Sequence, residues 1–272
     1  MLAIFCILSL LFSFSACDRS AGAASASLFT DVTEDDSRTE APSESETVKV
    51  ASKRIAFTFD DGPHPVYTRK IVDLAAELGG KVTFFVVGTM LLNEDSAAAF
   101  SYALDSGCEV GIHCFSHLVN FDECDDETYL FEISRTADIA KGISQGFEPT
   151  LMRPVGGRIT EERVKESPYA VVKWNIDTKD YLRKGAATEE ERDENVDAIV
   201  SEILSKASDG SIILMHDLYE NTLLAFSRAA RALVEEGYEL VTVTELLGED
   251  VEAGKVFSKG KPIAALTQGN QN

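Results

Sequence analysis

Short apolar segments rich in β-branched residues alternate with longer amphipathic segments through the middle of the chain. The amphipathic segments carry apolar positions at the spacing of an α-helix, at residues 68–78, 127–143, 195–207 and 223–237. The short segments predict seven strands, at residues 55–59, 81–87, 108–113, 150–154, 170–176, 211–216 and 239–243. Strands separated by helices pair in parallel through right-handed crossovers. The pattern therefore predicts an α/β fold, either a barrel or a doubly wound sheet.

The first residues of the chain have a different pattern. Residues 2–14 are uncharged and mostly apolar, but a spanning helix needs about 20 such residues, so this run fits a secretory signal instead. Small residues and then Cys17 follow it, which resembles a bacterial lipoprotein signal. We therefore expect residues 1–16 to be a lipoprotein-type signal peptide and Cys17 to be the lipid anchor. A plain cleaved signal with an incidental cysteine is the alternative.

The other segments outside the periodic region are polar. Residues 17–50 are rich in Ser, Thr, Ala and acidic residues, and such a composition cannot bury enough surface to fold. We expect this segment to be a disordered tether. Residues 249–272 lack clear periodicity and predict a frayed C-terminal tail. Residues 51–248 remain as one folded domain.

The charge balance narrows the classes of partner. The chain has 272 residues with 46 acidic and 25 basic side chains, which gives a formal net charge of −21. Proteins that bind nucleic acid need a basic face, so we expect no nucleic acid partner. The same charge argues against electrostatic docking on anionic lipid. A mean hydropathy of −0.04 excludes a polytopic membrane protein.

Five cysteines leave the disulfide status open. Cys6 and Cys17 lie in the predicted signal, so an odd number, Cys108, Cys114 and Cys124, remains in the domain. One disulfide with one free thiol is one interpretation, and the sequence does not pair the three residues. Three buried thiols that act as small hydrophobic side chains is the interpretation we prefer.

Polar and ionisable residues cluster where the predicted strands end. In parallel α/β folds the carboxyl ends of the strands are where functional sites are built. Three of the four histidines lie at such ends, which chance placement would not produce. The residues at these ends are Asp60, Asp61, His113, His117, Arg153, Asp177, Asp180, His216 and Asp217.

Two of these histidines and a neighbouring carboxylate have the chemistry of a metal site. Two imidazoles and one carboxylate, with positions left open for water, suit Zn²⁺ or a related divalent ion in a hydrolase. Because Asp60 and Asp61 are adjacent, one can bind the ion while the other faces the reacting water. A bound divalent ion lowers the pKa of its water towards ~7. His113 and His117 alone could equally form a surface or core pair, and the Asp-Asp-Gly-Pro sequence alone could be a turn.

Five motifs follow one another along the predicted domain: TFDDGP (58–63), HCFSH (113–117), RPVGG (153–157), DTKDY (177–181) and LMH (214–216). Their order and spacing over residues 52–247 resemble those of the polysaccharide deacetylase family, carbohydrate esterase family 4, which is related to the nodulation chitooligosaccharide deacetylase. The resemblance implies a distorted (β/α) barrel of about seven parallel strands. It also implies one divalent ion, Zn or Co with Ni or Mn as alternatives, and removal of acetyl groups from N-acetylglucosamine polymers or acetylated xylan.

The resemblance assigns roles around the ion. Asp60 corresponds to the general base, and Asp61, His113 and His117 correspond to the metal ligands. Arg153 corresponds to the residue that orients the base and balances its charge. A neighbouring guanidinium would keep the base ionised.

Further roles concern the leaving group and the substrate. His216 corresponds to the general acid that protonates the leaving amine, and Asp180 to the carboxylate that tunes it. The backbone N–H near Gly156 would help to hold the oxyanion. Tyr181 would wall the acetyl pocket, and Leu214 belongs to the same substrate-binding set.

The sequence departs from the family pattern at three positions. Cys114 occupies the usual Thr or Ser position, and we expect it not to become a fourth ligand because neighbours in sequence point apart. Val155 replaces a Pro, and Tyr181 replaces the usual Trp. We expect His64 to be a turn residue that binds no metal, and Trp174 to be a core residue within the fifth strand.

These observations predict an enzyme that removes N-acetyl groups from an N-acetylglucosamine-containing glycan, with peptidoglycan as the preferred substrate. Deacetylation of chitooligosaccharides or O-acetylated xylan is one alternative, and a glycan-binding lipoprotein that has lost catalysis is another. We expect a monomer whose partner is the glycan and which meets the membrane only through its N-terminal lipid. The expected location is the outer face of a bacterial cell membrane, with secretion as the alternative.

Overall fold

The computed structural model describes residues 52–260. The predicted signal peptide, Cys17 and the tether lie outside these residues, as do residues 261–272 of the predicted tail. None of the helices within residues 52–260 combines the length and the apolar character that a membrane span requires.

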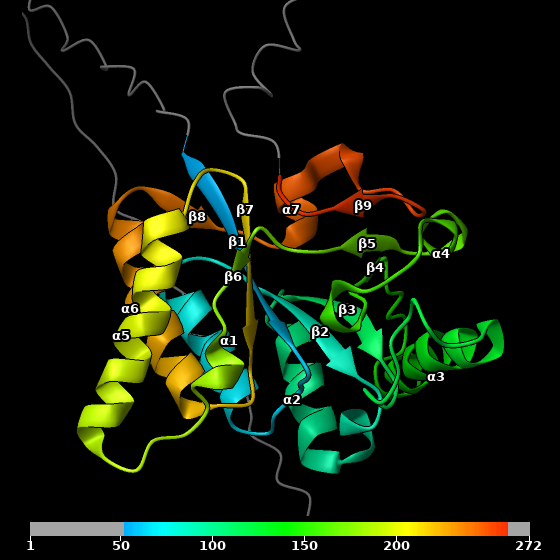
Figure 1. Ribbon diagram of the computed structural model, residues 1–272, viewed down its shortest axis with the longest axis horizontal. Coiled ribbons are helices and arrows are strands. Elements are labelled where there is room, and N and C mark those ends of the chain that lie inside the picture. The colour runs from blue at the N-terminus through cyan, green and yellow to red at the C-terminus, as the bar shows by residue number, and fades with distance from the viewer. Residues whose placement is uncertain (1–51, 261–272) are drawn as a thin grey trace, which may run out of the picture. The chain divides into compact units, whose positions relative to one another are not determined.

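A single curled sheet of parallel strands forms the centre of the described domain (Figure 1). The hydrogen-bonded order is β6-β7-β1-β2-β3-β4-β5-β9, and β8 pairs with the first half of β1. The α/β barrel predicted from the sequence is confirmed. The strands are β1 (Lys53–Asp60), β2 (Thr83–Val87), β3 (Glu109–Cys114), β4 (Leu151–Met152), β5 (Ala170–Val172), β6 (Ile176–Asp177), β7 (Ser211–His216), β8 (Tyr238–Leu240) and β9 (Val256–Phe257).

Helices cover the outside of this sheet, and α5 and α6 pack side by side (Figure 1). The helical segments predicted from periodicity are confirmed as α1, α3, α5 and α6. The helix α5 starts six residues earlier than predicted, because the Thr188 hydroxyl accepts from the backbone N–H of Glu191 and three glutamates fill the first turn. The helices are α1 (Tyr67–Glu77), α2 (Glu94–Asp105), α3 (Asp126–Ile143), α4 (Glu161–Glu166), α5 (Glu189–Lys206), α6 (Glu220–Glu235) and α7 (Val243–Leu247).

The central strand β1 divides its side chains between two environments. Alternate residues of a strand point to opposite faces. Phe57 and Phe59 face outward and pack against Phe226 of α6, with ring centroids 5.0 and 5.3 Å apart. Thr58 and Asp60 face the barrel interior, where both contact Arg153. The strand therefore anchors the helical layer on one face and carries polar chemistry on the other.

The prediction of one strand at residues 170–176 is wrong, because the structure divides these residues between two strands that are not neighbours in the sheet order. Its first part is β5 and its last part is β6, and these lie at opposite ends of the order β6 to β5. Only residues 173–175 connect them, and this link spans at most about 14 Å. The short link therefore brings the two ends of the sheet together and curls it into a barrel.

The predicted frayed tail is wrong for residues 249–260. The strand β9 pairs in parallel with β5. Lys259 then forms an antiparallel bridge to Ser211, and the N–H of Gly260 donates to the carbonyl of Gly210 at 2.7 Å. This segment thus crosses from β5 to β7 and helps to close the barrel. With the divided strand, it raises the count in the described part from seven to nine.

The cysteines of the domain form no disulfide. Cys108, Cys114 and Cys124 are free thiols, as we preferred from the sequence. Cys108 and Cys114 are buried, but Cys124 is partly exposed, so the expectation of three buried thiols is wrong for that residue. The guanidinium of Arg163 donates to the Cys124 carbonyl at 2.8 Å and makes this surface position a polar one.

Candidate active site

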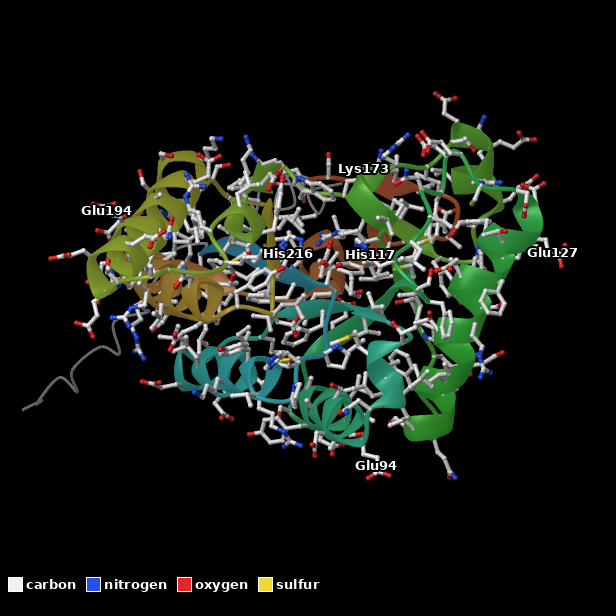
Figure 2. The ribbon with its side chains drawn as sticks, turned by 60° about the horizontal axis from the view of Figure 1, so that its bottom comes forward. Glu94, His117, Glu127, Lys173, Glu194 and His216 are labelled. Atoms are coloured by element: carbon white, nitrogen blue, oxygen red, sulfur yellow. The ribbon has the colours of Figure 1, made fainter. Side chains whose placement is uncertain are left out.

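A cavity of about 400 Å³ opens where the strands end, and eight of the predicted site residues line it. Figure 2 shows His117 and His216 near the centre of the domain. Arg153 and Asp180 do not line the cavity but lie directly behind it, each hydrogen-bonded to a lining residue. The lining residues are Asp60, Asp61, His113, His117, Val155, Gly156, Trp174, Asp177, Tyr181, Leu214 and His216.

Asp60 and Asp61 leave the end of β1 with different partners. Asp60 is the last residue of the strand, whereas Asp61 has a φ of 73°, in the left-handed region that non-glycine residues rarely adopt. Behind this turn, the Asp217 carboxylate lies so close to Gly62 that a Cβ there would meet Asp217 Oδ1 at 2.2 Å. Only glycine fits, and the turn rotates the Asp61 carboxylate toward the histidines.

Asp61, His113 and His117 form a group that could hold a metal ion. One donor atom from each lies within 4.8 Å of the other two. The two Nε2 atoms lie 3.3 and 3.1 Å from Asp61 Oδ1, yet this buried oxygen has no hydrogen-bond partner. Three donor atoms that converge without bonding to one another fit a shared divalent cation, and the mixed N and O donors suit zinc or cobalt.

The charge of Asp61 and the orientation of His113 agree with a ligand role. Burial raises the pKa of Asp61, but the imidazoles of His113 and His117 outweigh it and hold this pKa well below its usual range. His113 Nδ1 lies 2.7 Å from the carbonyl oxygen of Arg153. Because a carbonyl only accepts, Nδ1 donates to it, which leaves Nε2 as the atom of His113 that would bind the ion.

Cys114 is absent from this group within the described residues, as expected. It is fully buried and packs on the opposite side, among the apolar residues of α3 and β4. Burial raises the pKa of its thiol far above the usual range, so the sulfur stays protonated. The three-residue group therefore keeps open positions.

Asp60 is paired with a buried guanidinium. Nη1 of Arg153 donates to Asp60 Oδ1 at 2.8 Å and to the Thr58 hydroxyl at 2.7 Å. Nε and Nη2 donate to the carbonyls of Val172 and Lys173, both at 3.1 Å. Every nitrogen of this fully buried side chain is thus satisfied, and its position relative to the Asp60 carboxylate is set.

His216 is held by a second carboxylate. Nδ1 of His216 lies 2.7 Å from Asp180 Oδ1, and the backbone N–H of His216 donates to Oδ2 at 2.8 Å. The hydroxyl of Thr222, a residue that sequence reasoning missed, donates to the same Oδ2 at 2.6 Å. Burial lowers the pKa of His216, but Asp180 and the more distant Asp60 and Asp61 raise it to about 9. The imidazole is therefore cationic at neutral pH, with Nε2 facing the cavity.

Aromatic side chains form the cavity wall beside His216. The ring of Tyr181 lies edge-on to His216 with centroids 5.6 Å apart. Trp174 lines the cavity from the link between β5 and β6, so its predicted place as a core residue within a strand is wrong. A Cβ on Gly157 would lie 3.2 Å from the Trp174 ring, which shows how closely the Gly156 turn approaches it.

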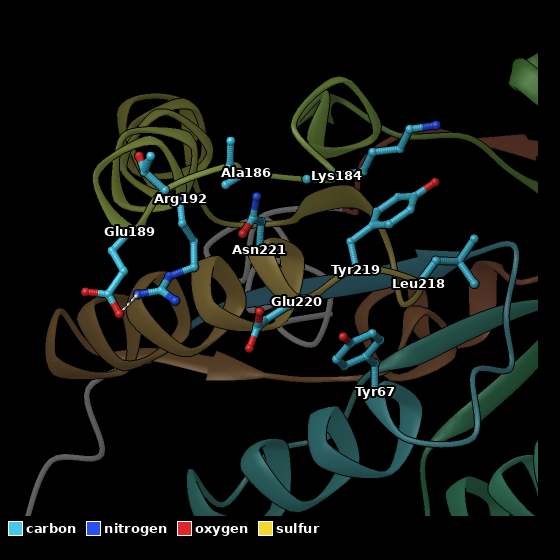
Figure 3. Close-up of a pocket in the computed structure, with 12 residues that line it drawn as sticks. Tyr67, Lys184, Ala186, Glu189, Arg192, Leu218, Tyr219, Glu220 and Asn221 are labelled. Carbon is cyan, nitrogen blue, oxygen red and sulfur yellow. Dashed lines mark ion pairs between the residues drawn. The ribbon is translucent and has the colours of Figure 1, made fainter.

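A second cavity, of about 490 Å³, has a different set of lining residues and different chemistry (Figure 3). It opens between the starts of α5 and α6, and Tyr67 and Tyr219 lie on one side of it. Its one marked ion pair joins Arg192 and Glu189 at 3.9 Å. No residue of the Asp61, His113 and His117 group lines it. The larger cavity is therefore not where the candidate metal site lies.

His64 has the turn role expected from the sequence. Its Nδ1 accepts from the backbone N–H groups of Val66 and Tyr67, at 3.1 and 3.2 Å, and so caps the start of α1. Its ring stacks on that of Tyr67 with centroids 4.4 Å apart. It is not part of the metal-ligand group found among residues 52–260.

Comparisons of the sequence and of the structure with known proteins both find polysaccharide or peptidoglycan deacetylases. The model of the polysaccharide deacetylase family matches residues 47–172. A peptidoglycan-N-acetylglucosamine deacetylase from Bacillus cereus is 31% identical over 203 residues, which cover 72% of this chain and 88% of that one. The peptidoglycan-N-acetylmuramic acid deacetylase PdaC from Bacillus subtilis is 35% identical over 201 residues, or 74% of this chain.

These matches differ in how much of the relative they cover. The chain spans only 40% of the length of the Bacillus subtilis relative. The solved structure of peptidoglycan deacetylase PdaC from Bacillus subtilis matches with a TM-score of 0.64 and 34% identity, over 72% of this chain and 90% of that structure. The structural match thus covers a larger share of this chain than the family model does.

Proposed function

This chain belongs to the polysaccharide deacetylase family, and we propose that it is a metal-dependent hydrolase that removes N-acetyl groups from peptidoglycan. One observation carries the proposal. Asp60, whose carboxylate is paired with a buried guanidinium, faces the same cavity as the Asp61, His113 and His117 group. His216, a cationic imidazole, faces this cavity as well. Amide hydrolysis needs these three elements: a base, an acid and an electrophile.

The base side of the reaction depends on Asp60. A divalent ion held by Asp61, His113 and His117 would polarise the acetyl carbonyl and acidify a water molecule. Asp60 takes the proton of the attacking water, because its carboxylate faces the cavity. Arg153 orients that carboxylate, because its guanidinium donates to Asp60 Oδ1 at 2.8 Å.

The acid side depends on His216. Expulsion of an amine requires a proton on its nitrogen, and an imidazolium supplies it at neutral pH. Because Nδ1 of His216 is bound to Asp180, the proton that leaves is the one on Nε2, which faces the cavity. Asp180 also stabilises the cation before transfer and prevents the ring from rotating.

The names of the relatives support peptidoglycan as the substrate, and the sequence signal supports the location. Zinc or cobalt is the proposed ion. We place the protein outside the cytoplasm, attached to the bacterial membrane through a lipid on Cys17. A Cys17→Ser variant would then leave the membrane fraction for the soluble fraction. Retention of this variant in the membrane would contradict lipid anchoring.

Acetate release tests the activity directly. A soluble form that begins at Thr47, loaded with Zn²⁺ or Co²⁺, is offered peptidoglycan, N-acetylglucosamine oligomers and acetylated xylan. We expect release from peptidoglycan, and loss of about 10² to 10⁴-fold in the Asp60→Asn variant with the metal retained. Release only from one of the other substrates would change the substrate class. If the folded, metal-loaded protein releases acetate from none of the three substrates, the alternative of a glycan-binding protein without catalysis is favoured.

A further inference from the structure

An acidic side chain lies on the buried face of α3, where the other positions are mostly apolar. Glu132 is only 4% exposed and belongs to the same stripe as Tyr129, Ile133 and Ala137. No salt bridge within the described residues involves it. Burial of an unpaired carboxylate is costly unless hydrogen bonds compensate for the lost water. The contacts of Glu132 therefore need an explanation.

These contacts all go to the loop that carries the metal ligand His117. Glu132 Oε2 accepts from the backbone N–H groups of Phe115 and Ser116, both at 2.8 Å. Oε1 accepts from the Ser116 hydroxyl at 2.6 Å. Both carboxylate oxygens are thus committed to two residues that immediately precede His117.

The Ser116 hydroxyl extends this support to the other side of His117. While it donates to Glu132, its oxygen accepts from the backbone N–H of Leu118 at 3.2 Å. The residues on both sides of His117 are therefore held by the Glu132 carboxylate. Ser116, before it, is held directly, and Leu118, after it, is held through the Ser116 hydroxyl.

The backbone of His117 requires such support. Its φ is 59°, a left-handed conformation that costs a residue with a Cβ free energy and persists only where the surroundings impose it. This conformation directs Nε2 to within 3.1 Å of Asp61 Oδ1. His113, in contrast, lies within β3 and is held by the sheet and by the Arg153 carbonyl. Of the two histidines, His117 is the one whose position depends on a loop.

We propose that Glu132 is a positioning residue for the metal site, which holds His117 in its ligating conformation through Phe115, Ser116 and Leu118. The inference rests on the proposed function in one respect, that Asp61, His113 and His117 bind a divalent ion. Glu132 touches neither ion nor substrate. It acts by lowering the conformational freedom of one ligand before the ion arrives, and so raises the affinity for the ion.

The test measures metal binding rather than turnover. Glu132→Ala removes all three hydrogen bonds, and partners behind a metal ligand typically change affinity by roughly 10 to 100-fold. We expect this loss in Co²⁺ affinity, measured by competition with a chromophoric chelator, with an altered visible absorption spectrum of the bound Co²⁺. Glu132→Gln keeps an oxygen for the two N–H groups and an amide for the Ser116 oxygen, so we expect it to recover most of the affinity.

A matched control lies on the same helix. Glu127 is exposed and points away from the domain (Figure 2), so Glu127→Ala should bind Co²⁺ as the unchanged protein does. Wild-type affinity and spectrum in Glu132→Ala would overturn the inference. If that variant does not fold, Ser116→Ala decides, because it removes only the hydroxyl link: a several-fold loss supports the inference and unchanged binding overturns it.

The same measurements separate this inference from the proposed function. If the unchanged protein binds no Co²⁺, the metal site and the inference both fall. If the unchanged protein binds Co²⁺ and releases acetate, while Glu132→Ala binds equally well, only the role of Glu132 is wrong.

Discussion

Nη1 of Arg153 lies 2.8 Å from Oδ1 of Asp60, and the two side chains are 0% and 4% exposed. The guanidinium also stacks on the ring of Phe85, 4.2 Å from its centroid. A buried ion pair gains little over an apolar pair, but the loss of one partner leaves a buried charge uncompensated. The contact therefore compensates the buried charge of Asp60 and orients its carboxylate rather than adding much net stability, and it makes both residues sensitive to substitution.

The first prediction concerns this pair. Arg153→Met should lower the free energy of unfolding by about 3–5 kcal/mol, because Asp60 stays buried without a counter-charge. Arg158→Met is the control, since its ion pairs with Asp122 and Glu123 are exposed to solvent and their loss should change stability much less. Urea unfolding of the metal-free proteins measures both. Equal stability of the two variants would contradict a compensating role for Arg153.

The second prediction separates the ligating histidines from the other histidine near the first motif. His117→Ala removes one of three donor atoms, so we expect a large loss of Zn²⁺ affinity in chelator competition. His64→Ala should retain the ion but lose about 1 kcal/mol of stability, because its ring caps α1. Unchanged affinity in His117→Ala would remove this residue from the metal site.

The third prediction concerns the alkaline limb of the pH–rate profile. His216 must be protonated to donate, so activity falls as the pH rises through its pKa, which Asp180 and the other carboxylates raise to about 9. A bound cation opposes this shift, so the limb lies at or below about pH 9. Asp180→Asn removes the largest raising influence and should move the limb to lower pH.

The control for this shift is Thr222→Val, which removes only one hydrogen bond to Asp180. We expect it to move the alkaline limb much less than Asp180→Asn does. An alkaline limb at the same pH in the parent protein and in Asp180→Asn would assign that limb to a group other than His216.

The fourth prediction concerns stability rather than catalysis. Burial raises the pKa of Asp217 from 3.8 to about 7, although the Thr68 hydroxyl donates to it. Between about pH 4 and pH 7 the folded state therefore binds more protons than the unfolded state, and this group makes stability fall as the pH rises. Between pH 5 and pH 8 the free energy of unfolding of the metal-free protein should fall by on the order of 2–3 kcal/mol because of this group. The Asp217→Asn variant should not show this fall. Parallel stability profiles would contradict this assignment.

Much of the site was predictable because short motifs report local chemistry. Asp60, Asp61, His113, His117 and His216 lie where strands end, and parallel pairing brings such ends to one edge. The register of β1 and β7 places Asp60 directly beside His216. The order of the motifs predicts that the two residues lie at the same edge of the sheet, but it does not predict this pairing. Helices with clear periodicity, such as α1 and α6, were equally predictable from the sequence.

The helix α2 was not predicted although it has a local cap at Asn93, but the strands that escaped prediction are those whose stability is not local. Two- and three-residue strands such as β5, β6 and β9 carry no periodicity, and the sheet partner alone defines them. Trp174 accordingly moved from an expected core position to the cavity wall, because the chain leaves β5 before it. The sequence predicted no structure at residues 256–260 because their partners lie more than forty residues away.

By itself, the sequence determined the α/β class, the helices α1, α3, α5 and α6 and the set of residues that carry the chemistry, since these depend on periodicity and on side-chain type. Only the tertiary structure decided how the barrel closes and which buried groups support the site. Thr222 behind Asp180 and Glu132 behind His117 are examples. Glu132 left one sequence signal, an acid within an apolar helical stripe, but the loop it holds lies sixteen and seventeen residues away and meets it only through packing of α3 on β3.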